Sequence, residues 1–282
     1  MHTSGSTGKP KGVVVRHSHL LGSIAGNVSG LGITPDDVYI AYLPLAHILE
    51  LTAECAVLGC GASLGYATPF TLTTNTAVVR PVGALEALRP TIMAGVPKIY
   101  DTVVKGVAAK IGSLPSCVSG LLRRVLAHRQ ANLGRPGATV ATDAVVRAMF
   151  GRAVGGRMRL MISGGGPLNG STHDFARSVF AGVSLLQGYG LTETCGGGTL
   201  QVRLLLLLLL LLLSVCPQLT LHAVAGPLQA VADMRTGMAG VPSCCCEIML
   251  HSEPEMGYMS GDTAGTVNGV DGQPVCGRGE IW

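Results

Sequence analysis

The stretch that decides the fold is residues 159–194, which read RLMISGGGPLNGSTHDFARSVFAGVSLLQGYGLTET. Residues 159–162 form a compact apolar run that predicts a strand, and this run leads directly into the glycine loop Ser163-Gly164-Gly165-Gly166-Pro167. Residues 183–186 predict a second strand, which ends at Gly188-Tyr189-Gly190. Two successive strands are therefore each followed by a glycine-containing loop.

A helix is predicted between these two strands. Ser171 and Asp174 have the spacing of a capping box, which would open a helix that continues to Phe180. Strands joined by a helical crossover run parallel, and ligands bind at the carboxyl edge of such strands in an α/β sheet. We therefore expect an α/β fold whose site lies at this edge.

The same alternation extends toward the N-terminus. Apolar residues at helical spacing end at Gly30, Gly32 and Pro35, and a short strand follows at residues 38–43. The remaining expected elements are a helix at 48–58, a glycine-rich turn into a strand at 59–65, and helices at 96–111, 121–131 and 143–150.

Composition narrows the class of protein. The 282 residues are 48% hydrophobic and 13% charged, which excludes a disordered chain and suits one large α/β core. The formal charge of +4 contains no block of basic residues, so we expect no nucleic-acid partner. Nine cysteines without regular spacing favour a reducing, intracellular compartment.

Two segments invite other interpretations. The triplet Cys244-Cys245-Cys246 lacks a second Cys/His pair at zinc-finger spacing, which favours small buried thiols over a metal site. Ten consecutive leucines, Leu204 to Leu213, are too short to span a bilayer. We interpret residues 199–234 as an aberrant Leu-rich insert; a buried or interfacial helix and a membrane anchor are the alternatives.

Residues 3–12, Thr-Ser-Gly-Ser-Thr-Gly-Lys-Pro-Lys-Gly, combine glycines, hydroxyls and lysines. Glycines let backbone N–H groups converge on an anion, and a lysine supplies the opposite charge, so this loop can hold phosphate. It is not a Walker loop, because Gly5 and Gly8 are only two residues apart and Pro10 follows Lys9. The alternative is a flexible Gly/Ser turn.

Four motifs in order resemble the signature of the adenylate-forming (AMP-binding) superfamily. They are the loop 3–12, Leu43-Pro44-Leu45-Ala46-His47, residues 163–168 and residues 188–194. Residues 95–101, 157–160, 254–258 and 278–282 are similar to long-chain acyl-CoA synthetases in particular. The resemblance covers about residues 1–198 and 235–282.

The resemblance implies ATP-dependent activation of a long-chain fatty acid to an acyl-adenylate and then to acyl-CoA, with Mg²⁺, ATP and coenzyme A taking part. It places the nucleotide phosphates on Thr3, Ser4, Gly5, Ser6, Thr7, Gly8, Lys9 and Lys11, and the adenine and acyl head on Gly164, Gly165, Gly166, Gly188, Tyr189 and Gly190. It also implies that Glu193 binds magnesium, that Thr192 lies beside the α-phosphate, and that His47 faces the reacting acyl group. Without the resemblance, Glu193 would be a helix-terminal acid, Tyr189 a core residue and His47 a structural residue.

The chain departs from the family pattern in three places. Part of the nucleotide-binding domain is expected before the phosphate loop, a short connection is expected after Gly198, and a ribose-binding aspartate and a mobile domain with a catalytic lysine are expected after Trp282. We therefore expect the large N-terminal domain of such an enzyme, incomplete at both ends and inactive alone, divided at residues 1–198, 199–234 and 235–282. The alternatives are an adenylate-forming ligase for aryl or amino acids and a non-catalytic truncated product. The resemblance also implies peripheral membrane association, without choosing between endoplasmic reticulum, peroxisome and plastid.

Overall fold

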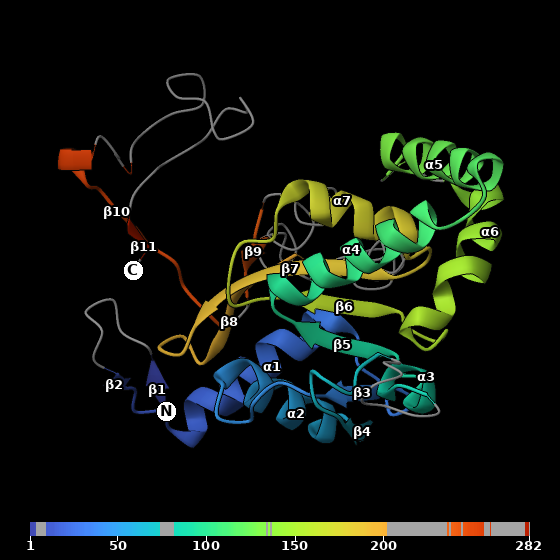
Figure 1. The fold of residues 1–282 in the computed structure, drawn as a ribbon. Helices are drawn as coiled ribbons and strands as arrows, with labels where there is room; N and C mark the ends of the chain where they lie inside the picture. The colour runs from blue at the N-terminus through green and yellow to red at the C-terminus, as the bar shows by residue number, and fades with distance from the viewer. Residues whose placement is uncertain are drawn as a thin grey trace, which may run out of the picture. The chain divides into compact units, whose positions relative to one another are not determined.

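The computed structural model describes residues 1–3, 10–73, 82–133, 135, 137–201, 236, 238–243, 245–256, 260 and 280–281. Its contacts divide the chain into two compact units, Met1–Cys245 and Cys246–Trp282. The first unit contains a seven-stranded sheet with helices on both faces, so the predicted α/β class is confirmed (Figure 1).

The sheet of the first unit is mixed, with the strand order β4-β3-β5-β6-β7-β8-β9. The strands from β4 to β7 pair in parallel, and the pairs β7/β8 and β8/β9 are antiparallel. Their bounds are β3 Val38–Ala41, β4 Ser63–Tyr66, β5 Ile92–Gly95, β6 Leu160–Ser163, β7 Ser184–Leu191, β8 Gly196–Leu200 and β9 Val241–Pro242.

Helices join the parallel strands because a parallel pair needs a long crossover connection. α1 (His17–Leu31) and α2 (Ile48–Gly59) lie on one face of the sheet, and α4 (Pro97–Gly112) and α7 (Gly170–Val179) lie on the other (Figure 1). The remaining helices are α3 (Ala84–Leu88), α5 (Ser116–Ala131), α6 (Val140–Phe150) and the 3₁₀ turn η1 (Gly151–Val154).

The strand order reverses next to β3. The chain runs from β3 outward to β4, and then returns to the other side of β3 as β5. The helices that follow adjacent strands at such a reversal separate, which leaves a crevice at the carboxyl ends of the strands. The topology therefore favours a ligand site near the ends of β3, β5 and β6.

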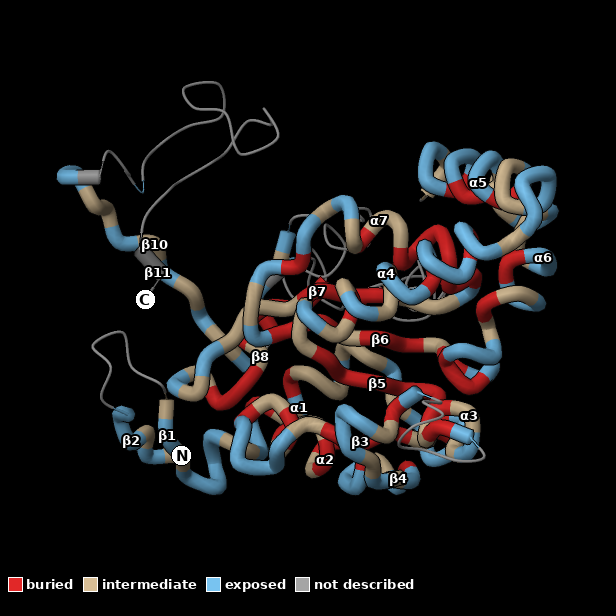
Figure 2. Tube along the Cα trace, viewed as in Figure 1, coloured by how far each residue is buried: buried red, intermediate tan, exposed pale blue. Residues whose placement is uncertain are grey.

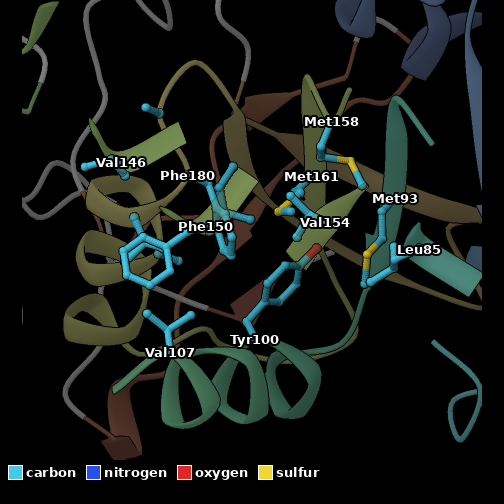
Figure 3. Close-up of a cluster of buried hydrophobic side chains, with 14 of the residues drawn as sticks. Leu85, Met93, Tyr100, Val107, Val146, Phe150, Val154, Met158, Met161 and Phe180 are labelled. Atoms are coloured by element: carbon cyan, nitrogen blue, oxygen red, sulfur yellow. The ribbon is translucent and has the colours of Figure 1, made fainter. Parts of the chain in front are cut away.

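Each face of the sheet has its own core. The larger core lies under α4 to α7 and contains Tyr100, Val146, Phe150, Met161 and Phe180 (Figure 3). The smaller core lies under α1 and α2 and contains Tyr39, Val57, Ile92 and Leu186. Both faces of β5 and β6 are covered, so these strands are almost entirely buried (Figure 2).

Several predicted elements differ from the observed ones. Asn169, rather than Ser171, caps α7, because the Asn169 side chain accepts a hydrogen bond from the Ser171 backbone N–H; the predicted capping box is wrong. β7 does not end at Gly188 but continues to Leu191, since it forms a hairpin with β8. The central strand β5 was not predicted.

The predicted Leu-rich insert is mostly outside the described residues. Thr199 and Leu200 lie in β8, while residues 202–235 are not described. The proposed domain division stays a prediction. The second unit, taken by itself, contains the antiparallel pair β10 (Leu250–His251) and β11 (Glu280–Ile281) and the 3₁₀ turn η2 (Pro254–Met256).

Candidate active site

A cavity of about 100 Å³ lies between α1, α2 and the adjacent face of the sheet. Its walls are mainly apolar, with Ile24, Leu31, Ala53, Val57, Ile92 and Leu200 among the lining residues. Tyr39 on β3 also lines the cavity and is 1% exposed. The cavity can therefore take an apolar group.

The rim of this cavity is built from residues that the sequence analysis selected. Six of them line it together, from three parts of the chain: His47, Gly164, Gly165, Gly188, Tyr189 and Gly190. Gly164 and Gly165 follow β6, and His47 precedes α2, so the rim lies at the carboxyl edge of the parallel strands. The prediction of a site at this edge agrees with the position of the cavity.

The glycine loop after β6 has a backbone form that suits a ligand wall. The Gly164 backbone N–H donates a hydrogen bond of 3.0 Å to the carbonyl oxygen of Gly95 on β5. Gly165 has φ of +77°, a conformation that side-chain-bearing residues rarely adopt. Glycine at 165 therefore lets the chain turn away from the sheet and leave the rim open.

The glycines at the end of β7 have a structural reason in addition to any binding role. A Cβ atom on Gly190 would lie 1.8 Å from the carbonyl oxygen of Gly196, and one on Gly188 would lie 2.9 Å from that of Thr199. The hairpin between β7 and β8 therefore requires these glycines. Tyr189 between them is half-buried, and its backbone N–H donates to Thr199 Oγ1 at 3.3 Å.

His47 is the N-cap of α2. Its Nδ1 accepts a hydrogen bond of 3.3 Å from the Leu49 backbone N–H. A neutral imidazole whose Nδ1 accepts must carry its proton on Nε2. The ring is exposed and lines the cavity, so Nε2–H is available to donate to a ligand oxygen.

Thr192 and Glu193 lie in the turn at residues 192–195 that joins β7 to β8, and neither lines the cavity. Thr194 holds this turn, because its hydroxyl donates to the carbonyl oxygen of Gly196 at 2.8 Å and accepts from the Leu191 N–H at 2.8 Å. Glu193 is exposed and makes no hydrogen bond or ion pair with a described residue. Its carboxylate is therefore available to a cation.

The predicted phosphate loop is described only at its ends. Thr3 in β1 (His2–Thr3) pairs with Lys11 in β2 (Lys11–Gly12). Ser4, Gly5, Ser6, Thr7, Gly8 and Lys9 lie outside the described residues. Gly166 is half-buried beside the rim but does not line the cavity. The phosphate-binding roles therefore stay predictions.

The sequence analysis missed a buried acid beside the cavity wall. Glu50 on α2 is 0% exposed, and its Oε2 accepts a hydrogen bond of 2.9 Å from the Tyr39 hydroxyl. A glutamate in the first turn of a helix usually faces water, so its sequence position carried no signal for burial.

The described residues form neither a metal-binding cluster nor a membrane-spanning helix. Within the described ranges, no group of three His, Cys, Asp or Glu side chains is arranged to hold a metal ion. Of the cysteine triplet, Cys245 is exposed and Cys246 is half-buried, so the prediction of buried thiols is wrong for these two residues. No helix in the described part of the chain has the length and apolar character needed to cross a membrane.

Comparison with known proteins extends these observations. The family described as AMP-binding enzyme matches residues 1–282. Long-chain-fatty-acid–CoA ligase 2 of Schizosaccharomyces pombe is 44% identical over 201 residues, which are 70% of this chain and 29% of that protein. Long chain acyl-CoA synthetase 8 of Arabidopsis thaliana is 39% identical over 208 residues, 71% of this chain and 29% of that protein.

Two solved structures share the fold. The N-terminal domain of FACL13 from Mycobacterium tuberculosis has a TM-score of 0.54 at 20% identity. The match covers 90% of this chain and 45% of the FACL13 chain. O-succinylbenzoate coenzyme A synthetase from Bacillus subtilis, in complex with ATP and magnesium ion, has a TM-score of 0.52 at 21% identity. The match covers 90% of this chain and 37% of the synthetase. The chain spans about a third of the length of the curated relatives it matches, from 29% to 36%.

Proposed function

The chain belongs to the family of AMP-binding enzymes, and on that premise we propose that it forms part of a ligase that activates a long-chain fatty acid with ATP and transfers it to coenzyme A. The observation that carries the proposal is the apolar cavity whose rim consists of His47, Tyr189 and the glycines of two motifs. An apolar pocket of about 100 Å³ with few polar groups at its mouth suits the first carbons of an acyl chain whose carboxylate remains at the rim.

The proposed reaction has two steps. The fatty carboxylate attacks the α-phosphorus of ATP, the bond from that phosphorus to the bridging oxygen breaks, and pyrophosphate leaves. The thiolate of coenzyme A then attacks the acyl carbonyl and displaces AMP. Both steps bring anions together, so the site must supply hydrogen-bond donors and positive charge where negative charge develops.

Residues of the rim, and Thr192 outside it, have distinct parts in this proposal. Gly164 and Gly165 leave room for the adenine and the acyl head, and Tyr189 supplies a ring against which the adenine can stack. The Nε2–H of His47 donates to an oxygen of the carboxylate and orients it. Thr192 lies beside the α-phosphate.

The phosphates are proposed to lie on the loop between Thr3 and Lys11, where Lys11 is exposed. The carboxylate of Glu193 is exposed and has no partner among the described residues, so it fits a magnesium ion, which prefers oxygen ligands and keeps several waters. When bound, the ion would neutralise phosphate charge. Glu193 would hold it from the turn at residues 192–195.

A filled-cavity variant tests the proposal on the chain itself. Ala53 lines the cavity from α2, so Ala53→Phe should block it, whereas Ala109→Phe places the same ring on an exposed position of α4. The probe is palmitoyl-sulfamoyl adenosine, a stable mimic of the acyl-adenylate, and binding is measured by calorimetry. We expect Ala53→Phe to weaken binding by about tenfold or more, because the apolar contact is lost, and Ala109→Phe to leave it unchanged.

Two outcomes would oppose the proposal. If the parent chain does not bind the palmitoyl mimic, the assignment of the cavity to an acyl chain is wrong. A second probe, benzoyl-sulfamoyl adenosine, mimics the adenylate of an aryl acid. If it binds more tightly than the palmitoyl mimic, the chain belongs with ligases of aryl acids. One relative from Arabidopsis thaliana, 30% identical, is named peroxisomal. An organelle is therefore the location in the cell that we propose.

A further inference from the structure

A second hollow lies at the opposite edge of the sheet, where β6 and β7 begin. It has a volume of about 330 Å³ and is formed by the end of α6, by η1, by the residues before β6 and by the residues between α7 and β7. Three arginines line it: Arg147, Arg152 and Arg157. None of its lining residues belongs to the cavity at the carboxyl edge.

The positive charge in this hollow is largely uncompensated. Arg157 is exposed and makes no hydrogen bond or ion pair with any described residue. Arg147 donates its Nε–H to the carbonyl oxygen of Ala181 at 3.2 Å and has no described carboxylate partner. Only Arg152 is paired, at 3.0 Å from Glu86.

A second described acid, on the same helix as Arg147, does not offset this charge. Asp143, one turn before Arg147 on α6, is already paired with the buried Arg129. Arg147 and Arg157 therefore line one concave space without a carboxylate partner among the described residues. Concave walls of low dielectric strengthen the field of such charges and attract anions.

Gly182, before β7, leaves the space that the guanidinium group of Arg147 occupies in the hollow. Gly182 has φ of +79°, and a Cβ atom there would lie 2.3 Å from Nη2 of Arg147. A larger residue at 182 would displace the guanidinium. Arg147 is also in the last turn of α6, where a cation stabilises the helix terminus, but that role involves neither Gly182 nor Arg157.

We propose that this hollow binds a phosphate-bearing anion. Arginine is suited to phosphate because its planar guanidinium donates two parallel hydrogen bonds to two oxygens of one group. Arg147 from α6 and Arg157 from the segment before β6 approach from different elements, so one phosphate group can be held from two sides. The phosphate is carried either by a soluble molecule or by a lipid headgroup.

The first test uses pyrophosphate and measures binding by calorimetry. The phosphate loop at residues 3–12 is a second place where pyrophosphate could bind, so the parent and the Lys11→Gln chain are both titrated. In the Lys11→Gln background, replacing Arg147 and Arg157 together by glutamine should weaken the remaining binding by about tenfold or more, and in the parent the same replacement should remove the part of the binding that Lys11→Gln leaves. Arg123→Gln is the matched control, because Arg123 is exposed on α5 and makes no bond with a described residue.

The second test separates the two sources of phosphate. Vesicles of phosphatidylcholine, with and without phosphatidic acid, are sedimented with the parent chain and with the double variant. Binding that needs phosphatidic acid and is lost in the double variant identifies a lipid headgroup. Pyrophosphate binding without vesicle binding identifies a soluble ligand.

The proposal is overturned if the parent chain binds neither probe. It is also overturned if the double variant binds both probes as tightly as the parent does, or if Lys11→Gln removes all pyrophosphate binding and no vesicle binding depends on Arg147 and Arg157. Because Arg157 makes no bond with the described chain, Arg157→Gln alone should leave the melting temperature unchanged. A weaker affinity in that single variant would therefore report the loss of a ligand contact and not a loss of folding.

Discussion

The hydroxyl of Tyr39 on β3 donates a hydrogen bond of 2.9 Å to Oε2 of Glu50 on α2, and both residues are buried. The other carboxylate oxygen, Oε1, has no hydrogen-bond partner among the described residues. Burial raises the pKa of Glu50 to about 7; the Tyr39 bond lowers it in part, and the charge of Glu54 raises it further. Glu50 therefore keeps its proton in the folded chain at pH values where an exposed glutamate has lost it.

The first prediction concerns the pH dependence of stability. An unfolded chain releases the Glu50 proton near the ordinary value of 4.5, whereas the folded chain keeps it to about 7. The contribution of Glu50 to the free energy of unfolding is therefore fully present below the pKa of the unfolded state. It falls by up to about 1.4 kcal/mol per pH unit above that value and is lost as the pH rises through the pKa of the folded state. Glu50→Gln should remove this slope in urea unfolding experiments, whereas Glu86→Gln, at a half-buried glutamate that is paired with Arg152, should retain it. An unchanged slope in Glu50→Gln would show that another group titrates.

Asp37 should have the opposite pH dependence. Burial alone would raise the pKa of Asp37, but hydrogen bonds from Arg159 and Thr91 and the Arg159 charge hold it well below its usual range. Its stabilising effect is therefore present above the unfolded value of 3.8 and is lost as the pH falls below it. Asp37→Asn should cost about 2 kcal/mol at neutral pH, less than a fully buried pair, because Arg159 is partly exposed.

The measurement for Asp37 is the free energy of unfolding at neutral pH and again below the unfolded pKa. The parent and Asp37→Asn should differ less at acidic pH, because the parent then carries a protonated Asp37. Asp36→Asn is the matched control, since Asp36 is the exposed neighbour. A difference that is the same at both pH values would mean that the carboxylate charge is not what stabilises the fold.

Gly190→Ala should disrupt the hairpin between β7 and β8. The new Cβ would meet the Gly196 carbonyl oxygen at 1.8 Å, so the strands must separate. We expect a loss of about 2 kcal/mol or more in thermal unfolding. Gly106→Ala in α4 meets nothing within 4 Å and should stabilise the chain by about 0.5 to 1 kcal/mol. Equal effects of the two substitutions would contradict the packing seen at Gly190.

Substitutions of His47 can separate its structural role from its proposed role in binding. His47→Ala removes the cap of α2 and should cost about 1 kcal/mol, while His47→Asn retains an N-cap acceptor and should cost less. Both variants lose the Nε2–H donor, so both should bind the palmitoyl mimic more weakly. If His47→Asn binds it as the parent does, the imidazole does not contact the ligand.

Glu193→Gln tests the magnesium assignment. Because Glu193 makes no bond with a described residue, its replacement should leave the melting temperature unchanged. The enhancement of ATP binding by magnesium, measured by calorimetry with and without the ion, should fall by about tenfold. Asp36→Asn again serves as the control, and normal magnesium enhancement in Glu193→Gln would remove this residue from the metal site.

Motifs that are local in sequence were predicted well. The glycine loop after β6, the helices α2, α4 and α7 and the parallel pairing of β6 with β7 follow from short apolar runs and their turns. The strand β5 was missed because Ile92–Gly95 is a brief apolar run without period. The cap of α7 was misassigned because Asn169, Ser171 and Asp174 all have suitable side chains, and only the backbone path selects among them.

The sequence by itself determined the α/β class and the edge of the sheet at which the motif residues gather, because strand period, glycine loops and motif order are properties of neighbouring residues. Only the tertiary structure decided which side chains share a space. The Asp37–Arg159 pair spans 122 residues, the cavity draws on two helices and several strands, and the hollow of Arg147 and Arg157 joins separate elements. The physical reason is that burial and charge balance depend on contacts that a parallel sheet makes between distant segments, and the residue type alone does not encode them.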